Sequence, residues 1–153
     1  MEEMTNERAK SFLEDAAVAH IGVVSHGEPY VTPMSFVFQG NRILFRTKPG
    51  KRYEAMVENP SVSIEASTFD EESGDWSSVI VKGTASLVID DETIERTVQL
   101  LLQKYESSLG SPLSRGGIQP MATFPHVMEV TIEEITGMSS GGYPAARTRP
   151  GRL

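Results

Sequence analysis

Hydrophobic and polar residues alternate along much of this chain, the pattern expected of strands with one face buried and the other exposed. Runs of this kind, bounded by turn residues, predict six strands: Val18–Ser25, Pro29–Phe38, Arg42–Thr47, Ser61–Phe69, Trp76–Ile89 and His126–Ile132. The first three are joined by short turns centred on Gly27 and Gly40, which are typical of hairpins. We therefore predict an antiparallel meander followed by further strands.

Three segments show helical spacing of their apolar residues instead. The first begins near Thr5 and the third near Asp90, both of them residues that can cap a helix start. The second runs over Lys51–Glu58 and ends before Asn59-Pro60. Because these helices interrupt the strands rather than alternate with them, we predict a mainly β protein, an antiparallel barrel with peripheral helices.

The long strand Trp76–Ile89 contains Gly83, which predicts a bulge or a bend at that position. One face of this strand should carry Val79, Val81, Ala85, Leu87 and Ile89. Residues 110–125 read as a long loop, and the residues from 137 onward are rich in Gly, Ser, Pro and Arg without periodicity. We expect a domain over 1–136 and a C-terminal tail over 137–153.

Length and composition narrow the class of protein. A chain of 153 residues suits one domain. No run approaches 18 apolar residues and the first residues are acidic and polar, so we expect a cytoplasmic protein without a membrane partner. The lack of cysteine excludes a thiol nucleophile and thiolate-bound metal. The three histidines, His20, His26 and His126, are too scattered to predict a metal site.

The charges are distributed unevenly. The net charge of −7 argues against a nucleic-acid partner, which would require a basic surface. Five cations nevertheless lie between Arg42 and Arg52 without any acid, and the tail adds Arg147, Arg149 and Arg152, again without an acid. We therefore expect a small anionic ligand, over which the tail could fold.

The segment from Arg46 to Arg52 is the main candidate site. A strand ends at Thr47, a turn containing Gly50 follows, and Lys51 opens a helix. The free N–H groups and the positive end of the helix dipole favour an anion there. A phosphate would meet hydroxyl, guanidinium, ammonium and backbone donors together. The alternative is a solvated basic turn that pairs with nearby acids.

Over roughly residues 16–88 the sequence resembles the FMN-binding split β-barrel proteins related to pyridoxamine 5′-phosphate oxidase, including nitroimidazole-resistance-like and deazaflavin-dependent members. Four motifs carry the resemblance in order: a G-x-P-x-V-x-P strand, an R-T-x-P-G-K-R turn, an N-P helix stop and a W-x-S-V-x-V-x-G strand. The resemblance implies a six-stranded antiparallel split β-barrel that forms a homodimer.

The resemblance also implies where a cofactor would lie. The implied cofactor-binding residues come from the basic turn for the phosphate (Arg46, Thr47, Lys51 and Arg52), from the second strand along the isoalloxazine ring (Thr32, Pro33, Met34 and Ser35), and from a later strand (Trp76 and Ser78) that is commonly contributed across the dimer interface. A packing role is the alternative for Trp76. Gly50 stands where family members often have serine, which removes one hydroxyl donor. No catalytic residue is predicted, because a flavin itself accepts the hydride.

The implied function is an FMN-binding oxidoreductase that transfers hydride to or from a small organic substrate. Two alternatives share the fold. One is a reductase that uses the deazaflavin coenzyme F-420, whose anionic oligoglutamyl tail could be bound by Arg42, Lys48 and the C-terminal arginines. The other is a non-catalytic protein that binds flavin or haem. The C-terminal arginine pattern of pyridoxamine 5′-phosphate oxidase itself is not matched, so we do not expect that specific activity.

Overall fold

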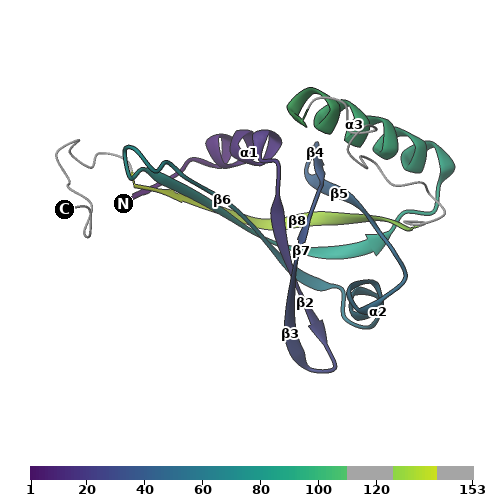
Figure 1. Ribbon diagram of the computed structural model, residues 1–153. Helices are drawn as coiled ribbons and strands as arrows, with labels where there is room; N and C mark the ends of the chain where they lie inside the picture. The colour runs from purple at the N-terminus through teal and green to yellow at the C-terminus, as the bar shows by residue number, and fades with distance from the viewer. Residues whose placement is uncertain (110–125, 141–153) are drawn as a thin grey trace.

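Antiparallel strands make up most of the molecule in a computed structural model that describes residues 1–109 and 126–140. One sheet holds its strands in the spatial order β3 (Glu28–Met34), β2 (Ala19–Ser25), β6 (Ser61–Phe69), β7 (Trp76–Leu87), β8 (His126–Ser139), β5 (Arg42–Thr47) and β4 (Val37–Gln39). A short strand, β1 (Glu2–Glu3), also pairs with β8. The sheet is not closed, because β3 and β4 are its two end strands. The prediction of a mainly β, antiparallel split barrel is confirmed (Figure 1).

Three helices pack on this sheet. The α1 helix (Asn6–Asp15) begins at Thr5, whose hydroxyl accepts the Arg8 N–H at 3.2 Å. The α2 helix (Lys51–Glu58) ends before Asn59-Pro60, as predicted. The α3 helix (Asp91–Leu109) begins after Asp90, whose carboxylate accepts the Thr93 N–H at 2.9 Å. Figure 1 shows α2 and α3 on opposite sides of the sheet.

The apolar side chains form two clusters on the two sides of β5. The larger cluster fills the barrel and includes Ile43 and Phe45 of β5. The smaller one lies under α3 and includes Leu44 of β5, with Leu101 and Tyr105 of the helix. Successive residues of a strand point to opposite faces, so β5 contributes to both clusters.

The predicted strand Pro29–Phe38 is in fact two strands. Pairing with β2 ends at Met34, and the chain then crosses to the far end of the sheet, where β4 pairs with β5. At the break, backbone groups of Phe36 bind α3 side chains instead of a neighbouring strand: its N–H donates to the Tyr105 hydroxyl at 2.9 Å, and its carbonyl accepts from Lys104 Nζ at 2.9 Å. Sequence periodicity does not show such replacement partners, which belong to a segment nearly 70 residues away.

Tyr105 is expected to contribute measurably to stability through its hydroxyl. This buried hydroxyl accepts a hydrogen bond from the Phe36 N–H and donates one to the Ala17 carbonyl at 2.8 Å. It therefore joins α3 to the segments just before β2 and just after β3. Tyr105→Phe would leave these backbone groups without that partner, which costs about 1–3 kcal/mol of unfolding free energy. Urea denaturation measures the loss, and a change below about 0.5 kcal/mol would contradict this role.

Two further strand predictions are corrected. The strand β7 ends at Leu87 rather than Ile89, although the Val88 N–H still donates to the Val127 carbonyl of β8 at 2.9 Å. Val88 is buried while Leu87 and Ile89 are exposed, the reverse of the predicted face. The strand β8 continues to Ser139 rather than ending at Ile132. The register shift opposite Gly83 leaves Glu133 as an extra residue, which breaks the alternation that would have revealed the rest of the strand. The bulge predicted at Gly83 is confirmed.

The predicted boundary between domain and tail falls inside β8, since residues 137–139 belong to this strand. The remainder of the tail, with Arg147, Arg149 and Arg152, and the predicted loop 110–125 lie outside the described residues. Within the described part of the chain, no helix has the length and apolar character needed to cross a bilayer.

Candidate functional site

The side chain of Arg52 links the basic turn between β5 and α2 to the neighbouring strands. Its guanidinium donates to the hydroxyls of Thr47 and Thr32 at 3.2 Å each. It also donates to the carbonyls of Pro33 and Arg46, each at 3.4 Å. The ring of Phe45 lies 5.4 Å below it. Arg52 thus joins α2 to β5 and β3, two strands that are far apart in the sheet order.

In these contacts the N–H groups of the Arg52 guanidinium donate to acceptors of the protein itself. Burial lowers the pKa of Arg52, while Tyr30 partly offsets this effect, and an arginine remains charged even so. Since Arg52 donates to the Thr32 oxygen, the hydroxyl proton of Thr32 is available to another acceptor. Arg52 therefore supplies positive charge and orients a neighbouring donor, rather than presenting an open fork to a ligand.

Lys51 is placed differently from its neighbour. Its side chain is exposed, and its ammonium lies 4.4 Å from the centre of the Tyr30 ring on β3. An exposed ammonium over an aromatic ring can reorient toward an anion at small cost. Gly50 precedes it as the N-cap and has no side chain to cap the helix, so the first N–H groups of α2 have no side-chain cap.

An aromatic pair next to this turn is not predicted from the sequence. Tyr53 of α2 stacks on His126, with ring centroids 4.0 Å apart and planes 9° apart. His126 is the cross-strand partner of Thr47, which places it beside the Arg52 contacts. The β5–β8 register is the decisive information, and it connects residues 79 positions apart, so no local pattern could have shown it.

The predicted site residues are brought together only in part. Thr32, Pro33, Thr47 and Arg52 meet through the hydrogen bonds given above, and the carbonyl of Arg46 joins them. The Arg46 side chain lies on the other face of β5 from Thr47, beside Val127 of the cluster under α3. Alternation along a strand requires this separation.

Met34 and Ser35 occupy different environments from Thr32. The Met34 side chain is buried in the barrel cluster, and Ser35 is exposed at the break between β3 and β4. Only their backbone lies next to the residues that contact Arg52.

Trp76 and Ser78 do not reach the basic turn within one chain. Ser78 pairs with Met138, whereas the end of β7 near the turn is marked by Leu87 pairing with Met128. Nine residues of extended strand separate Ser78 from Leu87, a span of about 30 Å. The Trp76 N–H is bound by the Ser140 hydroxyl at 2.9 Å at the far end of the strand.

The outer sheet face is the second feature of interest. We use this name for the outward residues of β3, β2, β6 and β7, which include Pro29, Val31, Gly22, Val24, Ser61, Ser63 and Ile80. Val31 is 61% exposed and Ile80 is 46% exposed, and a hollow of about 450 Å³ lies among the small residues. On the same face, Nδ1 of His20 lies 3.4 Å from the carboxylate of Glu65. No helix of the described residues covers this face.

The sequence model for pyridoxamine 5′-phosphate oxidase matches residues 5–139. The chain belongs to this family. The match spans all the strands and helices described above except β1, and it confirms the resemblance read from the four motifs.

Several solved structures share this fold. An FAD-binding protein from Mesorhizobium loti has a TM-score of 0.71 at 19% identity, with 91% of this chain and 97% of that chain covered. The FAD-binding protein of Mycobacterium smegmatis has a TM-score of 0.66 at 26% identity, with 91% and 98% covered. An uncharacterized protein of Rhizobium meliloti (strain 1021) is 28% identical over 80 residues, so the match spans 52% of each chain, about half of that relative's length.

Proposed function

We propose that this member of the family binds a flavin nucleotide at the turn between β5 and α2 and acts as an oxidoreductase. The observation that carries the proposal is the pairing of Lys51, exposed at the start of α2, with the Arg52 contacts to Thr32 and Thr47. An anionic phosphate fits the ammonium and the open N–H groups, and the Thr32 hydroxyl has a proton to donate. The donor set therefore fits a phosphorylated ring compound.

A bound flavin would supply the hydride chemistry, since its ring can accept and return a hydride. The protein's own residues bind and orient it. Lys51 and the N-terminal N–H groups of α2 would hold the phosphate, and Arg52 would fix Thr32 against β5. The Tyr53–His126 pair would form an aromatic wall that limits the access of water, while Phe45 supports Arg52 from below.

FMN is the proposed cofactor, and FAD is the second candidate because the similar proteins from M. loti and M. smegmatis are FAD-binding. The two differ in one phosphate and an adenosine, which would have to lie beyond the turn. The deazaflavin coenzyme and haem are further outcomes of the same experiment.

Titration of the purified protein with FMN, FAD, riboflavin, the deazaflavin coenzyme and haemin tests the proposal. We expect FMN or FAD to bind with a dissociation constant of about 1 μM or below, equivalent to about 8 kcal/mol. Riboflavin should bind at least about 10-fold more weakly, because it lacks the phosphate. Loss of flavin absorbance on addition of a nicotinamide reductant would then support the oxidoreductase. Absence of flavin binding at about 100 μM protein would overturn the proposal.

We further propose a homodimer formed through the outer sheet face. Val31 and Ile80 are exposed apolar side chains on this face, and no helix of the described residues covers them, which supports an interface there. Trp76 and Ser78 lie too far along β7 to reach the turn of their own chain, so they can contribute to a flavin site only from a second copy.

A further inference from the structure

Tyr30 of β3 lies where this end strand of the sheet meets the start of α2. Its ring is half-buried and packs in part against the barrel cluster. The residue pairs with the buried Val23 of β2, and its side chain lies on the same face of β3 as that of Thr32, two residues further on. The strand and the cluster therefore fix the position of the ring.

The first two residues of α2 contact this face of β3 together. Arg52 donates to the Thr32 hydroxyl at 3.2 Å, and the ammonium of Lys51 lies 4.4 Å from the centre of the Tyr30 ring. The two contacts differ in what they leave available to a ligand. The Arg52 guanidinium binds acceptors of the protein, whereas the Lys51 ammonium forms no hydrogen bond or ion pair with any residue of 1–109 or 126–140.

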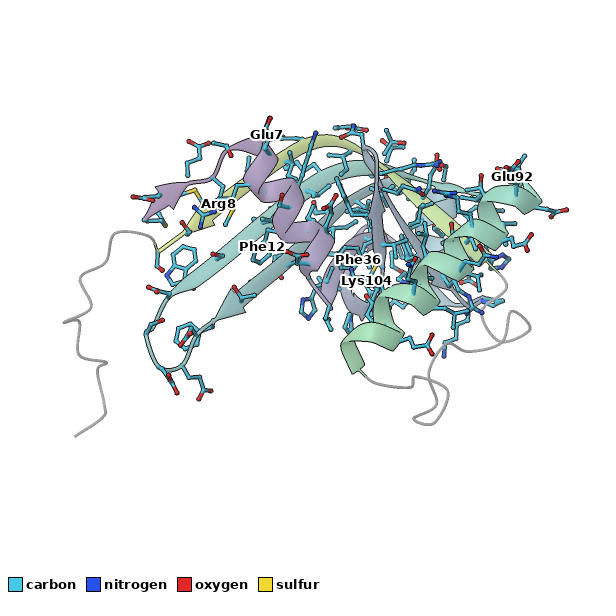
Figure 2. The ribbon with its side chains drawn as sticks, turned by 90° about the horizontal axis from the view of Figure 1, so that it is seen from above. Glu7, Arg8, Phe12, Phe36, Glu92 and Lys104 are labelled. Atoms are coloured by element: carbon cyan, nitrogen blue, oxygen red, sulfur yellow. The ribbon has the colours of Figure 1, made fainter. Side chains whose placement is uncertain are left out.

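Lys104 provides a comparison within the same chain. Its Nζ lies 3.9 Å from the centre of the Phe36 ring and also donates to the Phe36 carbonyl at 2.9 Å (Figure 2). Lys51 has the ring contact without such an acceptor. An ammonium carries three N–H groups, so those of Lys51 remain available to an anion while the ring attracts the charge.

An acid on the same helix could compete for Lys51. Glu54 lies three residues later on α2, a spacing that allows ion pairs on a helix surface, and both side chains are exposed. No such pair forms between them in the described structure, in which the ammonium lies over Tyr30 instead. Among the orientations open to an exposed lysine, the ring contact thus selects one that directs the charge toward β3.

We propose that Tyr30 is a positioning residue that makes the site selective for phosphorylated flavins, because its ring holds the Lys51 ammonium where the phosphate binds. A freely rotating lysine loses side-chain entropy when it binds an anion, and a lysine already held over a ring loses less. Riboflavin has no phosphate and gains nothing from this arrangement. The inference rests on the proposed function, in which Lys51 binds the flavin phosphate.

A double-mutant cycle on Tyr30 and Lys51, measured by fluorescence titration with FMN and with riboflavin, tests this role. We expect Tyr30→Leu to weaken FMN binding by about 3- to 5-fold and to leave riboflavin binding unchanged. Tyr30→Phe keeps the ring and should keep FMN affinity within about 2-fold of the wild type. In the Lys51→Ala background, Tyr30→Leu should have no further effect on FMN, because the cation that the ring holds is absent.

The outcomes separate this inference from the proposed function. Equal losses of FMN and riboflavin with Tyr30→Leu would show that the ring supports the barrel or the flavin ring, and would overturn the inference. A loss of FMN affinity that persists in full in the Lys51→Ala background would overturn it as well. In both cases the wild type still binds FMN and the proposed function stands. No binding of FMN or FAD by the wild type would overturn the proposed function together with the inference.

Discussion

Arg52→Ala is expected to weaken the binding of FMN and of riboflavin by similar factors, on the order of 10- to 100-fold for each. The reason is that the Arg52 guanidinium donates its hydrogen bonds to Thr32, Thr47 and two backbone carbonyls. Its loss would release β3 from α2 and leave Thr32 without its orienting partner. Binding of the flavin ring and binding of the phosphate would then both be weakened. Flavin fluorescence titration of both ligands measures the two losses.

Lys51→Ala is the matched control, because the neighbouring side chain is exposed and makes its ring contact with Tyr30 only at the surface. We expect it to weaken FMN binding by about 10-fold, the value of one charge-assisted contact, and to leave riboflavin binding unchanged. If Arg52→Ala instead weakened FMN alone, the guanidinium would contact the phosphate directly. Equal losses of both ligands with Lys51→Ala would place the phosphate elsewhere.

The sequence predicts the fold well where structure is local. The helix start at Thr5, the helix stop before Pro60 and the bulge at Gly83 all follow from residues next to them in the chain. The predicted strand ends are wrong where residues distant in the sequence determine where a strand ends. The strand β3 ends because Tyr105 and Lys104 replace its neighbours at Phe36, and β8 continues because β7 accommodates Glu133 as an extra residue.

The site shows the same division. The sequence identifies the basic turn and its neighbours on β3, since charge and spacing are visible there. The contact between Tyr53 and His126 is not predicted from the sequence, because it depends on the β5–β8 register. The case of Arg46 differs. Simple alternation places its side chain opposite to that of Thr47, whereas the resemblance carried by the motif R-T-x-P-G-K-R implies that both residues bind the phosphate.

The largest effect is expected from a charge placed on the outer sheet face. Ile80→Lys would put an ammonium on the β7 side of this face, opposite Glu65 in the neighbouring strand β6. In the single subunit this pair is favourable, so the fold should be preserved. In a twofold-symmetric dimer the charge enters the interface twice, each time at a cost of about 2–5 kcal/mol. We expect the dimer dissociation constant to rise by a factor of at least about 10³.

Ile89→Lys is the matched control, with the same residue types at a position that is 84% exposed and lies after the end of β7. Sedimentation should show the wild type and Ile89→Lys at twice the chain mass of 16.8 kDa, and Ile80→Lys at the chain mass itself. A wild-type protein that sediments at the chain mass, or Ile80→Lys that still sediments at twice it, would contradict an interface on this face.

Flavin affinity of the Ile80→Lys subunit then tests whether the site is shared. The substitution lies on the face opposite to the barrel interior, so it changes none of the contacts of Arg52 or Lys51. If a second copy supplies Trp76 and Ser78, the isolated subunit should bind FMN at least about 10-fold more weakly, since one stacking or hydrogen-bonding partner of the ring is lost. Full affinity in the isolated subunit would confine the flavin to one chain and leave Trp76 to its contacts at the far end of β7.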